Sequence, residues 1–215
     1  MYKVKGFVLR SKDLGDSLRS LTLYTDLLGR LPAVVKLKAG DFPLKFDLFS
    51  LSQFFLREKA GRFEVVKAKL IKPHFPKTAR EFFYRERISK LLASYQVAPS
   101  QRVFDLFSYY LSVTSEFKLA YVMFLLKFTF LEGVFPILSK CVLCGSKEIE
   151  SFSLDKGGVL CSRCGEGEFP WSYRDSRLSL KLLKAPFSSQ KGSYPGKRLD
   201  RIKTVFERHL SYRLG

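Results

Sequence analysis

Hydrophobic and polar side chains alternate in five short runs along the first 72 residues. The run at residues 2–10 places Val4 and Val8 on one face and Lys3 and Lys5 on the other. The four further runs, separated by turns that contain glycine, are residues 19–25, 31–38, 46–58 and 63–71. Alternation of period two predicts β-strands, and five short strands predict a small antiparallel barrel. An OB-like barrel fits this length, and an SH3-like barrel is the alternative.

The hydrophobic spacing becomes helical after Pro76. Pro73 and Pro76 end the strands, because proline cannot sit in a central strand or in a helix interior. Ser100 is a suitable N-cap for one helix. The run 117–131 is apolar nearly all round, which predicts a helix at the centre of a bundle. The other expected helices are residues 78–96, 100–114, 174–185 and 197–214.

The four cysteines form two matching pairs. Cys141 and Cys144 are followed, after 16 residues, by Cys161 and Cys164. Two cysteines separated by two residues curl around one side of a tetrahedral ion, so two such pairs complete its coordination sphere. We therefore expect a structural zinc site, with free thiols on the same scaffold as the alternative. A thioredoxin-like redox pair is disfavoured because no βαβ pattern surrounds either motif.

The segment between the cysteine pairs, residues 150–160, predicts a short hairpin that turns at residues 155–158. A glycine follows the second cysteine of each pair and permits the tight turn that metal binding needs. Together these elements predict an α+β fold: an N-terminal five-stranded OB-fold barrel followed by an α-helical domain with an inserted four-cysteine zinc finger. The expected domains are 1–75 for the barrel, 76–139 for the helical domain, 140–168 for the zinc finger and 169–215 for a C-terminal helical segment that completes the helical domain.

The chain is strongly basic, with 38 Lys and Arg against 20 Asp and Glu and a formal net charge of +18. Such a surplus favours a polyanionic partner, nucleic acid more than an anionic membrane, with a merely solvated basic surface as the alternative. Residues 1–75 hold 15 basic and 7 acidic side chains, and residues 171–215 hold 11 and 3. Residues 140–170 hold 4 and 5. We therefore expect DNA to bind the flanking segments more than the finger.

Neither targeting signals nor catalytic motifs stand out. The first residues include no apolar segment typical of a signal peptide, and the apolar run 119–126 is too short to span a bilayer. We expect a cytoplasmic, nucleoid-associated protein with reduced thiols. Residues 192–198 only approximate a phosphate-binding loop, because Arg198 stands where Ser or Thr would hold magnesium. The two histidines and the glutamates near the cysteines nominate no active site, so we expect no enzyme activity.

Several segments resemble the RecO family of recombination mediators. KGFVLRSKDLGDSLRSLTLYTDLLGRL (residues 5–31) is similar to the family's opening strands and turn. LLKFTFLEGVFPILSKCVLCG (residues 125–145) and KGGVLCSRC (residues 156–164) resemble the approaches to the two cysteine pairs. HLSYRLG (residues 209–215) is similar to the closing helix of the family. The resemblance covers essentially the whole chain.

The resemblance implies a non-catalytic function in DNA repair. A protein of this kind binds single- and double-stranded DNA without ATP and anneals complementary strands. With RecR it helps to load RecA onto DNA coated by single-strand-binding protein, whose acidic, aromatic C-terminal tail would suit an apolar groove within residues 77–132. We expect no membrane partner. The alternatives are a metal-dependent nucleic-acid-modifying enzyme and a transcription or translation factor that combines an OB barrel with a zinc ribbon.

The candidate DNA contacts are basic residues at the two ends of the chain, because phosphate neutralisation provides affinity without sequence preference. An OB barrel can add aromatic side chains on which bases stack, and Phe42 is one candidate. The candidates on the barrel are Arg10, Lys12, Arg19, Arg30, Lys36, Lys38 and Lys45. Those in the last helix are Lys197, Arg198, Arg201 and Lys203. Peripheral contacts are expected from Lys140, Lys147, Lys156 and Arg163 in the finger.

Overall fold

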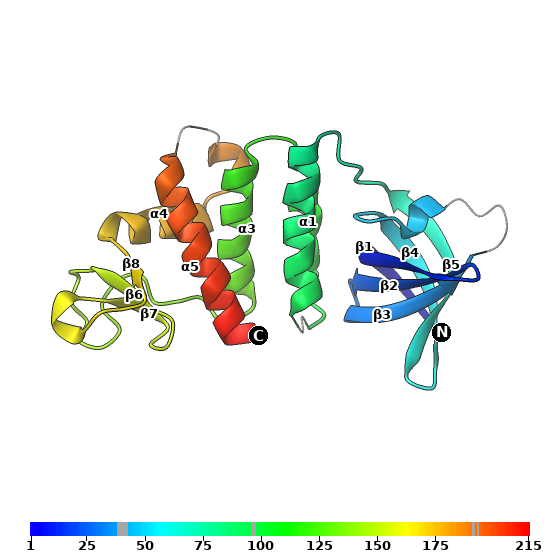
Figure 1. Cartoon of the computed structure of the whole chain (residues 1–215), viewed down its shortest axis with the longest axis horizontal. Helices are drawn as coiled ribbons and strands as arrows, with labels where there is room; N and C mark the ends of the chain where they lie inside the picture. The colour runs from blue at the N-terminus through cyan, green and yellow to red at the C-terminus, as the bar shows by residue number, and fades with distance from the viewer. Residues whose placement is uncertain (38–42, 96–97, 191, 193) are drawn as a thin grey trace. The chain divides into compact units, whose positions relative to one another are not determined.

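The computed structural model describes residues 1–37, 43–95, 98–190, 192 and 194–215. The chain divides into two compact units, Met1–Thr114 and Ser115–Gly215. The first unit contains the barrel and the helices that follow it, and the second contains the remaining helices and the cysteine finger (Figure 1). Two candidates for DNA binding, Lys38 and Phe42, lie outside the described residues.

The N-terminal strands close into a barrel. They are β1 (Tyr2–Gly15), β2 (Leu18–Thr25), β3 (Gly29–Lys36), β4 (Leu51–Lys59) and β5 (Arg62–Lys72). Their order is β1-β2-β3-β5-β4, and β1 pairs with both β2 and β4. The pairing of β3 with β5 is parallel, so the prediction of a wholly antiparallel barrel was wrong at this pairing, whereas the other pairings are antiparallel. This closed five-stranded arrangement is the OB-like barrel that the sequence predicted.

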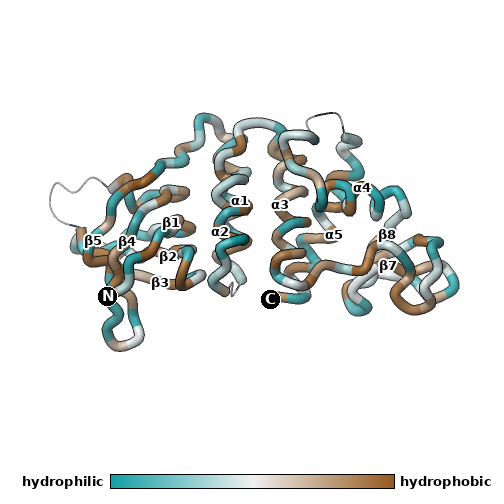
Figure 2. The backbone as a smooth tube through the Cα atoms, turned by 180° about the vertical axis from the view of Figure 1, so that it is seen from behind, coloured by the Kyte–Doolittle hydropathy of each residue, from teal (hydrophilic) through white to brown (hydrophobic). Residues whose placement is uncertain are grey.

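The barrel core consists of inward-facing residues of every strand and of Phe46, which lies in a short helical turn before β4. Val4 and Val8 are buried, whereas Lys3 and Lys5 are exposed on the outer surface, which confirms the alternation predicted for the first strand. The same alternation of hydrophobic and hydrophilic residues is visible along the barrel strands in Figure 2. The buried core residues are Val4, Val8, Leu21, Leu23, Leu31, Ala33, Val35, Phe46, Phe54, Leu56 and Val65.

The strand expected over residues 46–58 begins later, at Leu51, and this part of the prediction was wrong. A short 3-10 helix, η1 (Pro43–Phe46), precedes it. The Ser50 hydroxyl donates to the Leu44 carbonyl oxygen at 2.7 Å, and the backbone of Phe49 adopts a left-handed φ of 69°. Side-chain hydrogen bonds to nearby backbone compete with the strand ladder, so the apolar run starts as a turn.

Two helices complete the first unit, α1 (Ala79–Ser94) and α2 (Gln101–Leu111). The Ser100 hydroxyl accepts a hydrogen bond from the Val103 N–H, which confirms the predicted N-cap. On the outer surface of β1, Phe7 packs against Phe104 and Phe107 with ring centroids 5.0 and 5.1 Å apart. The helices therefore cover one end of the outer surface of β1 and leave the end that carries Lys3 and Lys5 open.

The second unit is built on α3 (Phe117–Leu131), which lies as predicted and packs against α4 (Tyr173–Lys184) and α5 (Gly196–Leu214). In Figure 1, α5 runs beside α3, and the Tyr121 hydroxyl of α3 donates to the Glu207 carboxylate of α5 at 2.7 Å. The smaller elements are β6 (Ser151–Ser153), β7 (Gly158–Leu160), η2 (Ser162–Cys164), β8 (Phe169–Pro170) and η3 (Phe187–Gln190). Within the described part of the chain, no helix combines the length and the apolar character needed to cross a membrane.

Candidate metal centre and nucleic-acid interface

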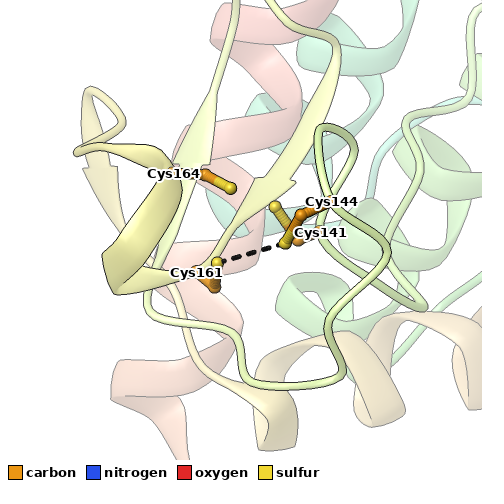
Figure 3. A group of neighbouring side chains, drawn as sticks. All are labelled: Cys141, Cys144, Cys161 and Cys164. Carbon is orange, nitrogen blue, oxygen red and sulfur yellow. Dashed lines mark hydrogen bonds between the residues drawn. The ribbon is translucent and has the colours of Figure 1, made fainter.

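The four cysteine sulfurs converge on one point. All four Sγ atoms lie within 4.8 Å of one another, and those of Cys144 and Cys161 are 3.6 Å apart. Figure 3 shows the side chains of Cys141 and Cys144 facing those of Cys161 and Cys164. Tetrahedral coordination with bonds of about 2.3 Å places sulfurs about 3.8 Å apart. The arrangement therefore fits a metal ion held by four thiolates.

Two tight turns bring each pair of cysteines to the centre. The Gly145 N–H donates to the Cys141 carbonyl oxygen at 2.9 Å, and the Cys164 N–H donates to that of Cys161 at 3.1 Å. Gly145 and Gly165 then have φ values of 75° and 118°, in the region that favours glycine. The predicted role of the glycine after each second cysteine is thus confirmed by the backbone.

The electrostatics of the cluster favour a bound cation. Burial by itself would raise the pKa of the Cys141 thiol, but backbone N–H groups of Cys144, Cys161 and Leu143 donate to its sulfur and lower the pKa to about 6. Ionisation of this sulfur in turn disfavours loss of the Cys164 proton. Contacts with the Cys144 and Cys161 side chains raise the pKa of Cys164 to about 12. A divalent cation at the centre would relieve this repulsion.

The finger is attached to the rest of its unit by close packing. The hairpin of β6 and β7 forms as predicted, and β8 adds a third strand beside β6. A side chain at Gly158 would meet the Ile137 carbonyl oxygen at 2.4 Å, so only glycine allows this approach. From α5, the Arg213 guanidinium donates to the Leu154 and Asp155 carbonyl oxygens at 3.0 and 3.1 Å. The finger therefore braces the C-terminal helix.

In the described part of the chain, acidic side chains form no comparable site. Among the residues that the structure describes, the cysteine quartet is the one group of three or more His, Cys, Asp or Glu side chains arranged to hold a metal ion. Glu168 has a structural contact instead, because its carboxylate accepts a hydrogen bond from the Leu154 N–H at 2.9 Å. Burial opposes ionisation of this carboxyl, but hydrogen bonds from backbone N–H groups lower its pKa.

Three of the predicted barrel contacts lie on the open outer surface. Arg10, Lys12 and Lys36 are all exposed. Arg10 and Lys12 of β1 lie opposite Thr22 and Ser20 of β2 in the barrel register. These side chains are available to a phosphate backbone, as the prediction requires.

Three other predicted barrel contacts are partly engaged within the protein. Arg19 forms an ion pair with Asp47 at 3.4 Å, and its side chain is 18% exposed. Arg30 donates to the Ala93 carbonyl oxygen at 3.3 Å. Lys45 lies over the ring of Phe46, with its Nζ atom 5.2 Å from the ring centroid. These residues are less free to bind DNA than Arg10, Lys12 and Lys36.

The predicted C-terminal contacts also differ from one another. Lys197 is exposed. Arg198 and Arg201 bind the fully buried carboxylate of Asp175 in α4, at 3.2 and 2.9 Å. Lys203 lies 3.8 Å from Asp200 in the same helix. The two arginines therefore have a structural partner within the second unit.

A basic surface on the barrel was absent from the sequence prediction. Across β1, β4 and β5, one row of neighbours is Lys3, Phe55 and Lys67, and the next row is Lys5, Gln53 and Lys69. All four lysines are exposed and Phe55 is half-buried. We call the four lysines (Lys3, Lys5, Lys67 and Lys69) the lysine face. The K-x-K spacing in β1 and β5 was visible in the sequence, but the pairing of both strands with β4 was needed to unite them.

The architecture defines an OB-barrel protein with a helical unit and a cluster of four cysteines that could hold a metal ion. A family model described as Recombination protein O C terminal matches residues 88–215, which is more than half of the chain. The chain therefore belongs to the RecO family of DNA repair proteins, in agreement with the resemblance of its motifs.

Curated relatives extend the similarity to the barrel. A protein named DNA repair protein RecO from Caldanaerobacter subterraneus is 25% identical over 215 residues, covering 93% of this chain and 83% of the relative. The protein of the same name from Alkaliphilus metalliredigens is 28% identical over 200 residues, covering 85% and 79%. That from Thermoanaerobacter sp. is 26% identical over 178 residues, covering 76% and 71%.

Proposed function

We propose that this protein is a non-catalytic recombination mediator that binds single- and double-stranded DNA and anneals complementary strands. The lysine face is the observation that carries the proposal. Four exposed lysines lie on β1 and β5, the two strands that flank β4, and residues two apart along a strand are about 6.8 Å apart. The described residues include no ion pair to any of these lysines. Their charges are free to displace the counterions of a phosphate backbone.

Phe55 gives the lysine face a means of holding unpaired bases. The side chain is half-buried between Lys3 and Lys67 in the register of the sheet. A base can stack on an aromatic ring whatever its identity, so binding would be independent of sequence. Arg10, Lys12 and Lys36 would extend the contact along the same barrel. Annealing then needs only proximity and charge neutralisation, without an active site.

The metal that we propose for the cysteine site is zinc in a structural role. Four thiolates complete a tetrahedral coordination sphere and leave no position for water or substrate. Zinc would pin the hairpin of β6 and β7 to the preceding loop, and through Arg213 it would stabilise α5. The ion would supply folding energy and no chemistry.

Membership of the RecO family supports a proposal about the protein partners. We infer that the protein acts with RecR to help load RecA onto DNA coated by single-strand-binding protein. An acidic C-terminal tail on that protein would be attracted to a chain whose net charge is +18. A cytoplasmic, nucleoid-associated location is consistent with this activity.

Annealing of complementary oligonucleotides tests the proposal. The purified protein is mixed with strands coated by single-strand-binding protein, without nucleotide or added metal, and duplex formation is followed by fluorescence. Replacing the four lysines of the lysine face by glutamine should slow annealing more than tenfold. It should also make the slope of log affinity for single-stranded DNA against log salt concentration shallower by about three. The matched control replaces four exposed basic residues outside the proposed contacts, Arg57, Lys59, Arg62 and Arg208, by glutamine.

The alternative functions give different results in the same assay. Strand cleavage would indicate a nucleic-acid-modifying enzyme, and a preference for RNA would indicate a transcription or translation factor. Either outcome, or an equal effect of the lysine-face and control substitutions, would contradict the proposal.

A further inference from the structure

A row of basic side chains covers the exposed side of α4. Arg174, Arg177, Lys181 and Lys184 follow one another at intervals of three, four and three residues, which places them along one side of a helix. All four are exposed, and the remaining exposed residue of α4 is Tyr173. We call these four residues the α4 stripe. No acidic residue interrupts it.

The acidic residue of α4 faces the opposite way. Asp175 is fully buried, its carboxylate caps the helix by accepting from the Ser172 N–H at 3.0 Å, and it binds Arg198 and Arg201 of α5. The only carboxylate side chain of α4 is therefore paired inside the protein and cannot neutralise the positive charges of the α4 stripe. Asp175 directly follows Arg174 in the sequence. Its ion pairs therefore also hold Arg198 and Arg201 at the first turn of α4.

The charges of the α4 stripe have no acidic partner among the described residues. Arg177 lies over the ring of Tyr173 at 5.9 Å, and Lys181 lies over that of Tyr194 at 5.8 Å. Cation–π contacts orient a side chain without cancelling its charge. Four positive charges thus remain along a helix of 12 residues, which is about 18 Å long.

We propose that the α4 stripe is a second DNA-binding site, so that one chain holds two strands, one on the barrel and one on α4. The inference rests on the proposed annealing function and explains how annealing can occur within a single molecule. A linear row of cations without an acidic neighbour complements a polyanion of regular charge spacing. An acidic protein segment is the competing occupant, and the experiment below separates the two.

The test measures whether one DNA strand recruits another. An oligothymidine is immobilised, the full-length protein is bound to it, and capture of a second, fluorescent oligothymidine is measured. Because the two strands cannot pair, capture requires two protein sites. The wild-type protein should capture the second strand. Replacing Arg174, Arg177, Lys181 and Lys184 by glutamine should reduce capture at least about fivefold, while binding to the first strand weakens less than about threefold.

The control is the glutamine variant of Arg57, Lys59, Arg62 and Arg208, which loses the same number of charges. Melting curves verify that both variants remain folded. If the wild type anneals complementary strands but the α4 variant captures as much second strand as the control, the second site does not exist. If capture is unchanged and only binding to the acidic tail of single-strand-binding protein is lost, the stripe binds protein instead of DNA. Failure of the wild type to bind or anneal DNA would contradict the proposed function itself.

Discussion

The barrel and the cysteine finger are both small β-structures, but they are stabilised in different ways. The barrel encloses a core of eleven buried residues from every strand and from η1. In the finger, the corresponding cluster contains Cys141, Leu160 and Cys161, with Val142 and Cys164 partly buried against it. This cluster is much smaller than the barrel core, so we expect the finger to depend on a bound metal more than the barrel does.

The two regions also differ at the surface. The outer surface of the barrel presents the lysine face, while the finger segment, residues 140–170, has 4 basic and 5 acidic residues. In many basic proteins a four-cysteine finger would be the natural place to look for DNA. We therefore expect a metal at the cysteines to support the fold, and DNA to bind the barrel and the helices.

Loss of the metal site should have the largest effect on stability. Cys161 is buried at the end of β7, and Cys161→Ser removes one of the four sulfurs. We expect zinc to be lost and the melting temperature of the second unit to fall by more than about 10 °C. Metal analysis and calorimetry measure both quantities. An unchanged transition in a zinc-free protein would show that the finger folds on packing alone.

The stability of the barrel should depend on its core side chains and should not change when metal is removed. Phe54 is fully buried, and its neighbour Phe55 is half-buried on the outer surface. Phe54→Ala should lower the free energy of unfolding of the barrel by about 3–5 kcal/mol because it leaves a cavity. Phe55→Ala is the matched control, with a loss of less than about 2 kcal/mol. Denaturant unfolding checks both values, and equal losses would contradict the register of β4.

Lowering the pH should reduce the stability of the first unit by a smaller amount. Burial, assisted by the charges of Lys72 and Arg85, lowers the pKa of His74 in the first unit from 6.5 to about 4. A histidine with a depressed pKa favours the folded state while neutral, so its contribution is complete above pH 6.5 and is lost as pH falls toward 4. Between pH 7 and pH 5 the loss is about 2 kcal/mol.

His74→Asn should remove this part of the pH dependence. Denaturant unfolding of the wild type and the variant at pH 7 and pH 5 isolates it, because the other titrating groups are common to both proteins. A variant that loses as much stability as the wild type would show that His74 does not stay neutral in the folded barrel.

The local patterns predicted much of this structure. Period-two alternation located five strands, capping at Ser100 and the apolar run 117–131 located helices, and cysteine spacing located the metal site. These features depend on neighbouring residues in the chain and are therefore visible in the sequence. The start of β4 was missed because hydrogen bonds of Ser50 and Ser52 with preceding carbonyl groups override the apolar pattern.

The surfaces were predicted less well, because they depend on residues that are distant in the chain. The lysine face exists because β4 lies between β1 and β5, which alternation alone does not specify. Arg198 and Arg201 looked like free charges in the sequence, yet both bind the buried Asp175. Likewise, the spacing of the α4 stripe was visible, but the burial of Asp175 within the same helix was not.

The affinity for single-stranded DNA tests the contrast between barrel and finger most directly. Anisotropy of a labelled oligonucleotide gives the dissociation constant of the wild type, of the wild type treated with a zinc chelator, and of the variant whose lysine face is replaced by glutamine. We predict that the variant binds at least about tenfold more weakly, whereas chelation changes affinity less than about threefold. If chelation abolished binding while the variant bound like the wild type, DNA would bind the finger and the account would be wrong.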